Sequence, residues 1–258
     1  MKSYMLKASV ALFLFIITSC SAGFKPSPLP RYEFPPNTRV GIINMVEDDM
    51  THVHVGTTVF NNFSKKYEVD FKFSQHVENE LARNIQDNCQ FEVEQIPPTP
   101  LLLEHKNRLI KVSKTEKRAI INPELASEFS LLANKYNADV FFIMRTYRMQ
   151  DFIADSVEYL EGYGLYTRSI LGLSGAFAYA NLIIQGVYTH PPTFIGGEDF
   201  NYKDENRGIF VKIDFNLPDD LNNIPRKKLR KIDAILKERS KGVTYRILEK
   251  THLLTCGN

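Results

Sequence analysis

An uncharged stretch of the chain constrains the fold more than any other feature. No Asp, Glu, Lys or Arg occurs between Arg168 and Glu198. As a strand, it has apolar residues on both faces: Ala178, Ala180, Leu182 and Ile184 on one, and Phe177, Tyr179, Ile183 and Val187 on the other. Pro191 and Pro192 predict a turn, after which "TFIGGEDF" returns as an antiparallel strand. Residues 169–197 therefore belong in a core, or in a hairpin buried in a partner or a membrane.

Apolar periodicity predicts a mixed β-sheet with helices packed on it. Besides the uncharged stretch, strands are expected in five segments: "RVGIINMV", "HVHVGTTVF", "CQFEVEQI", "VFFIM" and "GIFVKIDFN". Helices are expected over residues 73–88 with Ser74 as N-cap, over residues 122–136 with Asn122 as N-cap, and from about residue 219 onward. The order of these segments is typical of a single α/β (α+β) domain covering residues 39–258.

The N-terminal nineteen residues have the layout of an export signal. Lys2 and Lys7 precede an apolar run from Ala8 to Ile17, and small residues follow. Ten apolar residues are too few for a helix that crosses a bilayer, which needs roughly 20. Residues 1–19 are therefore predicted to be a signal peptide that is removed.

The end of this segment indicates where cleavage occurs. Ile17, Thr18, Ser19 and Cys20 resemble the lipobox of bacterial lipoproteins. The resemblance implies that Cys20 becomes the first residue of the mature chain and is acylated on sulfur and nitrogen. Ser21 implies the outer membrane, with the domain on the periplasmic face, because aspartate there commonly retains Gram-negative members at the inner membrane. The alternative is ordinary cleavage after Ala22, which yields a secreted protein without lipid.

Residues 20–38 are predicted to be a lipidated cysteine followed by a tether. The stretch "KPSPLPRYEFPP", residues 25–36, contains five prolines in twelve positions. Such a sequence favours polyproline geometry at about 3.1 Å per residue, which would hold the domain some 40 Å from the lipid. The alternative is a segment that becomes ordered by lying along a partner.

The charge of the chain argues against one class of partner and indicates one possible binding surface. The chain has 32 Lys and Arg against 30 Asp and Glu, so removing Lys2 and Lys7 leaves 30 against 30. A nucleic-acid binder usually has a marked basic excess, and we expect no nucleic acid here. One local cluster, "RKKLRK", could bind an acidic partner or lipid headgroups, or could simply be a solvated helix face; its cations are Arg226, Lys227, Lys228, Arg230 and Lys231.

Two cysteines remain once Cys20 is assigned to lipid. Cys89 and Cys256 would lie in a compartment that favours oxidation, so a disulfide between them is expected. It would tie the last residues of the chain to the middle of the domain. The alternative is two thiols that never meet.

No motif in the sequence points to catalysis, and no catalytic residue, metal or cofactor is expected. "GGED" at 196–199 resembles the signature of diguanylate cyclases, but Asp199 stands where that family has Glu, and a strand bulge at the glycines is the preferred interpretation. His52 and His54 are expected on the solvated side of a strand rather than on zinc. The chain also lacks a Gly-x-Ser-x-Gly elbow.

These features favour a non-enzymatic outer-membrane lipoprotein that is a structural or assembly part of a cell-envelope complex, such as the outer-membrane ring of a secretion system. In inferred architecture it resembles the curli-secretion channel lipoprotein and the lipoprotein activators of peptidoglycan synthases, which implies other envelope proteins as partners in an oligomeric assembly. The alternative is a binding module for an envelope glycan or lipid, in which Tyr159, Tyr163 and Tyr166 form a stacking surface. A hydrolase with an unrecognised site ranks last.

Overall fold

A computed structural model describes residues 27–151, 156, 158–170, 173–200, 209–215, 217 and 223–253. The expected signal peptide, Cys20 and Cys256 lie outside the described residues. Among the described residues, no helix combines the length and the apolar character needed to cross a membrane.

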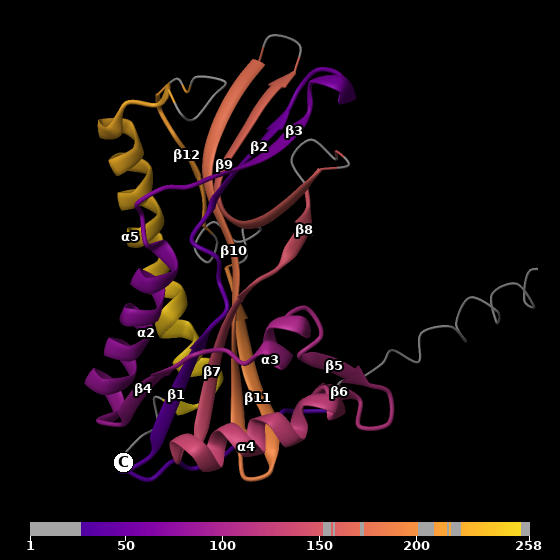
Figure 1. The fold of residues 1–258 in the computed structure, drawn as a ribbon, viewed down its shortest axis with the longest axis vertical. Coiled ribbons are helices and arrows are strands. Elements are labelled where there is room, and N and C mark those ends of the chain that lie inside the picture. Colours follow the sequence, from indigo (N-terminus) through magenta and orange to yellow (C-terminus); the bar gives the residue numbers. More distant parts are fainter. Residues whose placement is uncertain are drawn as a thin grey trace, which may run out of the picture.

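Strand β10 (Leu173–Thr189) is the spine of one curled mixed sheet (Figure 1). Its first half pairs with β9 (Tyr159–Ile170) and β12 (Ile209–Lys212). Its second half pairs with β7 (Val140–Thr146) and β11 (Pro192–Asp199). The main strand order is β3-β2-β9-β10-β7-β1-β4, so β10 joins the two halves of the sheet.

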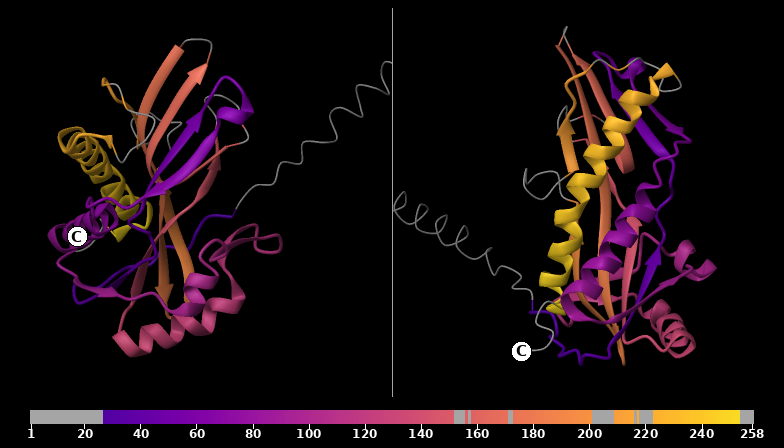
Figure 2. Two further views of the ribbon diagram at one scale, coloured as in Figure 1. Left: turned by 45° about the horizontal axis from the view of Figure 1, so that its top comes forward. Right: turned by 90° about the vertical axis from the view of Figure 1, so that its left-hand side faces the viewer.

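One half of the sheet is covered on both faces. Here β1 (Arg39–Asn44) runs parallel to β4 (Glu92–Ile96) and β7. The helices α2 (Phe73–Cys89) and α5 (Arg226–Lys250) lie side by side over one face (Figure 2). Over the other face lie α3 (Pro100–Glu104), η2 (Pro123–Leu125), α4 (Ala126–Tyr136) and a hairpin of β5 (Ile110–Ser113) and β6 (Arg118–Ile121).

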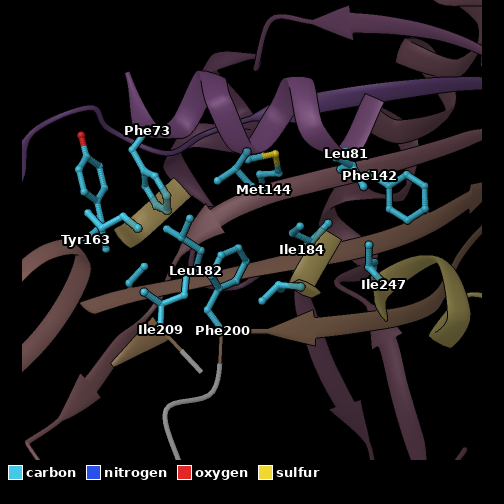
Figure 3. Packing of buried hydrophobic residues seen from close by; sticks show 14 of the residues in the cluster. Phe73, Leu81, Phe142, Met144, Tyr163, Leu182, Ile184, Phe200, Ile209 and Ile247 are labelled. Atoms are coloured by element: carbon cyan, nitrogen blue, oxygen red, sulfur yellow. The ribbon is translucent and has the colours of Figure 1, made fainter. Parts of the chain in front are cut away.

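Alternate residues of β7 enter the two cores. Phe142 and Met144 pack in the core under α2 and α5, which Figure 3 shows together with Leu81 and Ile247. Phe141 and Ile143 pack in the other core, under α4. All of these residues are buried, which confirms the prediction that "VFFIM" forms an interior strand.

The other half of the sheet extends beyond the helices at one end of the molecule. It contains β2 (Met50–Val55), which is parallel to β9, and β3 (Phe63–Tyr67), which forms one sheet edge. The short helix η1 (Val59–Asn61) connects β2 and β3, and β8 (Arg148–Gln150) folds back along β9. The β9–β10 and β2–β3 pairs project at this end of the long axis (Figure 1).

The uncharged stretch is largely a core strand. β10 is buried from Ala178 to Val187 except at Ile183, and β11 returns antiparallel to it as the sequence predicts. Gly186 faces Gly196 whereas Val187 faces Phe194, so the register shifts by one residue at the "GG" pair. This confirms the predicted strand bulge.

The predicted tether is wrong for residues 27–38, which pack along the domain. The Ser27 amide donates a hydrogen bond to the Lys117 carbonyl oxygen at 2.8 Å. The ring of Tyr32 stacks on Tyr188 with centroids 4.0 Å apart, and Leu29 packs against the core under α4. The prolines prevent a helix or an interior strand, but the apolar side chains between them still bury surface on the domain.

The start of α2 corrects the predicted cap. Lys72, in the left-handed conformation, occupies the N-cap position and makes no side-chain capping bond. Ser74 lies inside the helix, where its amide and hydroxyl both donate to Asp48 Oδ1, at 3.1 and 2.6 Å. A carboxylate from the loop after β1 therefore takes over the capping function.

Candidate functional site

A cleft of about 420 Å³ opens where β10 changes partners. Pairing of β10 with β7 ends at Leu182 opposite Thr146, and pairing with β9 begins at Asn181 opposite Gly162. The strands β7 and β9 separate at this point, and β8 folds back against β9. The cleft is lined by Glu47, Asp49, Thr51, Ser64, Lys66, Lys106, Thr146, Arg148, Glu158, Tyr159, Glu161 and Gly162.

One side of the cleft is an ion-pair network. Glu47 accepts from Lys66 at 2.5 Å and from Lys106 at 3.2 Å. The hydrogen bonds that these two ammonium groups donate lower the pKa of the Glu47 carboxyl, and donating to Glu47 raises the pKa of Lys66. Both shifts favour the ion pair between Glu47 and Lys66, and Lys106 places a second cation beside the same carboxylate.

The other side presents hydrogen-bonding groups beside an aromatic ring. The guanidinium of Arg148 lies over the Tyr159 ring, 3.9 Å from its centroid, and Tyr159 is 42% exposed. The Thr146 hydroxyl donates to Glu161 at 3.4 Å, and Asp49 and Glu158 add carboxylates. Carboxylates, hydroxyls and an exposed aromatic ring suit a polar ligand that carries hydroxyl or amino groups, such as a sugar.

The predicted tyrosine stacking surface is wrong for two of its three residues. Tyr163 and Tyr166 are both 0% exposed. Tyr163 packs on Phe73 of α2 and donates its hydroxyl to the Asp48 carbonyl oxygen, whereas the Tyr166 hydroxyl donates to Asp151 at 3.1 Å. Burial raises the pKa of both phenols. The two side chains point to opposite faces of β9, and both faces are covered, so Tyr159 alone remains accessible.

The predicted basic cluster lies on the first turns of α5. Arg226, Lys227, Arg230 and Lys231 are exposed, and Lys228 is half-buried with its ammonium 5.5 Å from the Phe215 ring centroid. The apolar residues Ile232 and Leu236 of the same helix face the core. The structure thus places all five cations together at the helix N-terminus, where positive charge interacts unfavourably with the helix dipole.

The predicted solvated environment is wrong for His52, whereas His54 is half-buried. His52 is 1% exposed, and its Nε2 lies 2.7 Å from Thr167 Oγ1. His54 Nδ1 lies 2.8 Å from the same oxygen, and the Phe63 ring packs against both imidazoles. Across the described ranges, no group of three or more metal-binding side chains comes together.

Cys89 and the "GGED" segment make contacts that stabilise the fold. Cys89 is buried at the end of α2, with its Sγ 2.7 Å from the carbonyl oxygen of Leu253, and its predicted partner Cys256 lies outside the described residues. In "GGED", the Glu198 carboxylate is 1% exposed and forms ion pairs with Arg246 and Lys250 of α5.

Sequence reasoning missed an exposed apolar loop. Val59 and Phe60 of η1 are 66% and 93% exposed, at the end of the β2–β3 pair. The alternating pattern of "HVHVGTTVF" made Val59 look like a core residue. Gly56 after Val55 was the available signal, because β2 ends there and Val59 lies beyond the last buried position.

Comparison with known proteins gives distant structural similarity only. No protein-family model matches the chain, and no curated protein matches it. A Xanthomonas campestris protein of the DUF330 family is 9% identical with a TM-score of 0.42, over 90% of this chain and 93% of that one. PelC from Paraburkholderia phytofirmans, solved as a dodecamer, is 7% identical with a TM-score of 0.34, over 91% and 97%. A Helicobacter pylori homologue of the neuraminyllactose-binding hemagglutinin is 11% identical with a TM-score of 0.33, over 90% and 99%.

Proposed function

We propose that this chain is a non-enzymatic outer-membrane lipoprotein, acylated on Cys20, whose periplasmic domain is a structural or assembly part of an envelope complex such as a secretion-system ring. The observation that carries the proposal is the export signal ending in Ile17, Thr18, Ser19 and Cys20. Several acyl chains bury enough CH₂ groups, at about 0.8 kcal/mol each, to hold a protein on a bilayer without a membrane-spanning helix.

The position of the domain relative to the anchor supports this proposal. Ser27, the first described residue, lies seven residues after Cys20 and is already hydrogen-bonded to the domain. The short intervening segment restricts the domain to the neighbourhood of the bilayer. A lipidated protein held this way meets its partners at the membrane surface.

Two surface features support an assembly function. Val59 and Phe60 are large apolar side chains exposed at one end of the molecule, and the loop that carries them leads directly into the edge strand β3. Exposed apolar groups beside an open sheet edge favour association with another protein. The basic start of α5 offers a second, charged surface for docking.

The test combines labelling, fractionation and native size. We expect palmitate incorporation that Cys20→Ser abolishes, outer-membrane fractionation, and a shift to the inner membrane in Ser21→Asp. We expect Phe60→Ser to reduce the native mass of the detergent-extracted complex, whereas Leu131→Ser, which removes an apolar residue 64% exposed on α4, leaves that mass unchanged. A monodisperse monomer without an envelope partner would contradict the assembly function.

A second candidate function is a binding module for an envelope glycan, and the cleft beside Tyr159 favours it. Soluble peptidoglycan fragments should then raise the melting temperature of the protein by mass action. Tyr159→Ala and Glu161→Gln should remove this shift, whereas Tyr245→Ala, at an equally exposed ring on α5, should retain it. Absence of a shift with all fragments would leave the assembly function as the sole proposal.

A further inference from the structure

We infer that the β5–β6 hairpin contacts anionic phospholipid headgroups of the membrane that anchors the chain, and thereby fixes which face of the domain points toward the bilayer. The inference rests on the proposed acylation of Cys20. It assigns an orientation that the lipid anchor alone does not provide.

The anchor is close to the hairpin. The amide of Ser27 donates to the carbonyl oxygen of Lys117, in the turn between β5 and β6, at 2.8 Å. Ser27 lies seven residues after Cys20, and an extended chain of that length spans at most about 25 Å. The lipid on Cys20 therefore enters the bilayer within that distance of the hairpin.

The hairpin and the turn before it are rich in exposed cations. Arg108, Lys111, Lys114 and Lys117 are all exposed. Lys111 has a distant partner in Glu124, at 3.9 Å. Within the described part of the chain, Arg108, Lys114 and Lys117 form no ion pair. Unpaired cations near an anionic membrane strengthen binding roughly fivefold each.

The same hairpin exposes an apolar side chain. Val112, in the middle of β5, is 69% exposed, and Lys111 and Lys114 lie on either side of it in the sequence. A surface that combines exposed cations with an apolar residue matches the interfacial region of a bilayer, where headgroup charge and acyl boundary meet. An acidic protein would satisfy the cations but gives no reason for an exposed valine on the same strand.

The inference assigns one surface of the molecule to the membrane and leaves other surfaces for protein partners. The hairpin lies with α4 over one face of the sheet, and α2 and α5 cover the opposite face (Figures 1 and 2). The β2–β3 loop with Val59 and Phe60 projects at the far end of the long axis from α4 (Figure 1). With the hairpin on the bilayer, the apolar loop and the basic start of α5 remain accessible to protein partners.

The test uses the mature chain from residue 20 onward carrying Cys20→Ser, so that lipid cannot contribute, and measures co-sedimentation with vesicles. We expect salt-sensitive binding to phosphatidylcholine vesicles that contain phosphatidylglycerol, and none to pure phosphatidylcholine vesicles. The double variant Lys114→Ala and Lys117→Ala should bind about 25-fold more weakly. The control variant Lys227→Ala and Lys231→Ala removes the same charge from α5 and should bind within about twofold of the parent.

A second readout reports orientation in the acylated protein. A polarity-sensitive fluorophore attached through Val112→Cys should shift to the blue on reconstitution into vesicles, whereas the same label attached through Val59→Cys should not. Equal binding to neutral and anionic vesicles would overturn the inference, even when palmitate labelling succeeds. An equal loss of vesicle binding in both double variants would overturn it as well. If palmitate labelling fails but the hairpin double variant still loses vesicle binding, the proposed lipid anchor is wrong. The affinity of the hairpin for anionic lipid is then supported independently of the anchor.

Discussion

Arg246 Nε of α5 lies 2.9 Å from Oε1 of Glu198, a β11 carboxylate that is 1% exposed. Lys250, one helical turn further along α5, contacts the other oxygen of the same carboxylate. The pair ties the C-terminal part of the long helix to the bulged end of β11. The acidic residue of the "GGED" segment therefore serves the fold.

Breaking this buried pair should cost substantial stability. We expect Glu198→Gln to lower the free energy of unfolding by about 3 kcal/mol, because it leaves two cations beside a buried neutral amide. The control is Glu92→Gln, which breaks an exposed pair with Arg39 at 2.8 Å and should cost less than about 1 kcal/mol. Urea titrations of both variants measure the difference, and equal losses would contradict the structural role of Glu198.

Two glycines should respond to alanine in opposite directions. A Cβ on Gly164 of β9 would lie 1.9 Å from the carbonyl oxygen of Thr51 on β2, so Gly164→Ala must push apart two paired strands. A Cβ on Gly242 of α5 would lie 3.2 Å from Nη1, at the far end of the Arg246 side chain, which needs to shift by only a few tenths of an ångström. Gly242→Ala should stabilise the helix by about 0.5 to 1 kcal/mol, whereas Gly164→Ala should lower the melting temperature. Stabilisation by both would contradict the β2–β9 pairing.

Periodic segments were predictable because their burial is decided locally. The helix expected at residues 73–88 is α2, and the cap and proline of residues 122–123 do begin η2, which leads into α4. The β10–β11 hairpin and its bulge were likewise visible in the sequence. In each case the apolar pattern has one period. Asn122 with Pro123 and the glycine pair of β11 also mark their boundaries, whereas the start of α2 carries no such signal.

The candidate site was less predictable because long-range pairing decides exposure. Tyr163 and Tyr166 form a regular pattern with Tyr159, but β9 acquires β2 and β10 as neighbours and cores on both faces. His52 is buried by contacts with Thr167 and Phe63, which lie on two other strands. The cleft arises where β7 and β9, which pair with successive parts of β10, separate from each other, and no local pattern encodes that separation.

Burial of Glu78 should make stability depend on pH. Burial raises the pKa of this carboxyl above its ordinary value of 4.5; the hydrogen bond donated by Asn44 lowers the pKa, and the charge of Asp48 raises it. Because the pKa of Glu78 is raised in the folded state, the stability linked to this carboxyl is fully present below about pH 4.5. It is lost as the pH rises through the pKa of Glu78 in the folded protein.

Glu78→Gln should therefore stabilise the protein at pH 7, because it removes the buried charge and keeps an oxygen that can accept from Asn44. The gain should disappear as the pH falls below about 4.5, since Glu78 is then protonated. Thermal melts across this pH range measure the difference in melting temperature between the variant and the parent protein. Glu94→Gln, at an exposed position of β4, is the control and should show no such difference; a gain that persists at low pH would refute the explanation.

The predicted disulfide has a direct chemical test. Leu253, whose carbonyl oxygen lies 2.7 Å from Cys89 Sγ, precedes Cys256 by three residues, a length of chain that spans at most about 11 Å. We expect a cross-linked Cys89–Cys256 peptide in digests made without reductant. Cys256→Ser should lower the free energy of unfolding by about 2 to 5 kcal/mol, but only under oxidising conditions. Alkylation of both thiols in the native protein would rule the bond out.

The intact mass of the mature protein from membranes tests the lipid anchor most directly. We expect a chain that begins at Cys20 and carries the added mass of a diacylglyceryl group and an N-acyl chain, with the lipid lost in Cys20→Ser. A chain that begins at Gly23, after cleavage at Ala22, and carries no lipid would contradict the membrane attachment on which the proposed function rests.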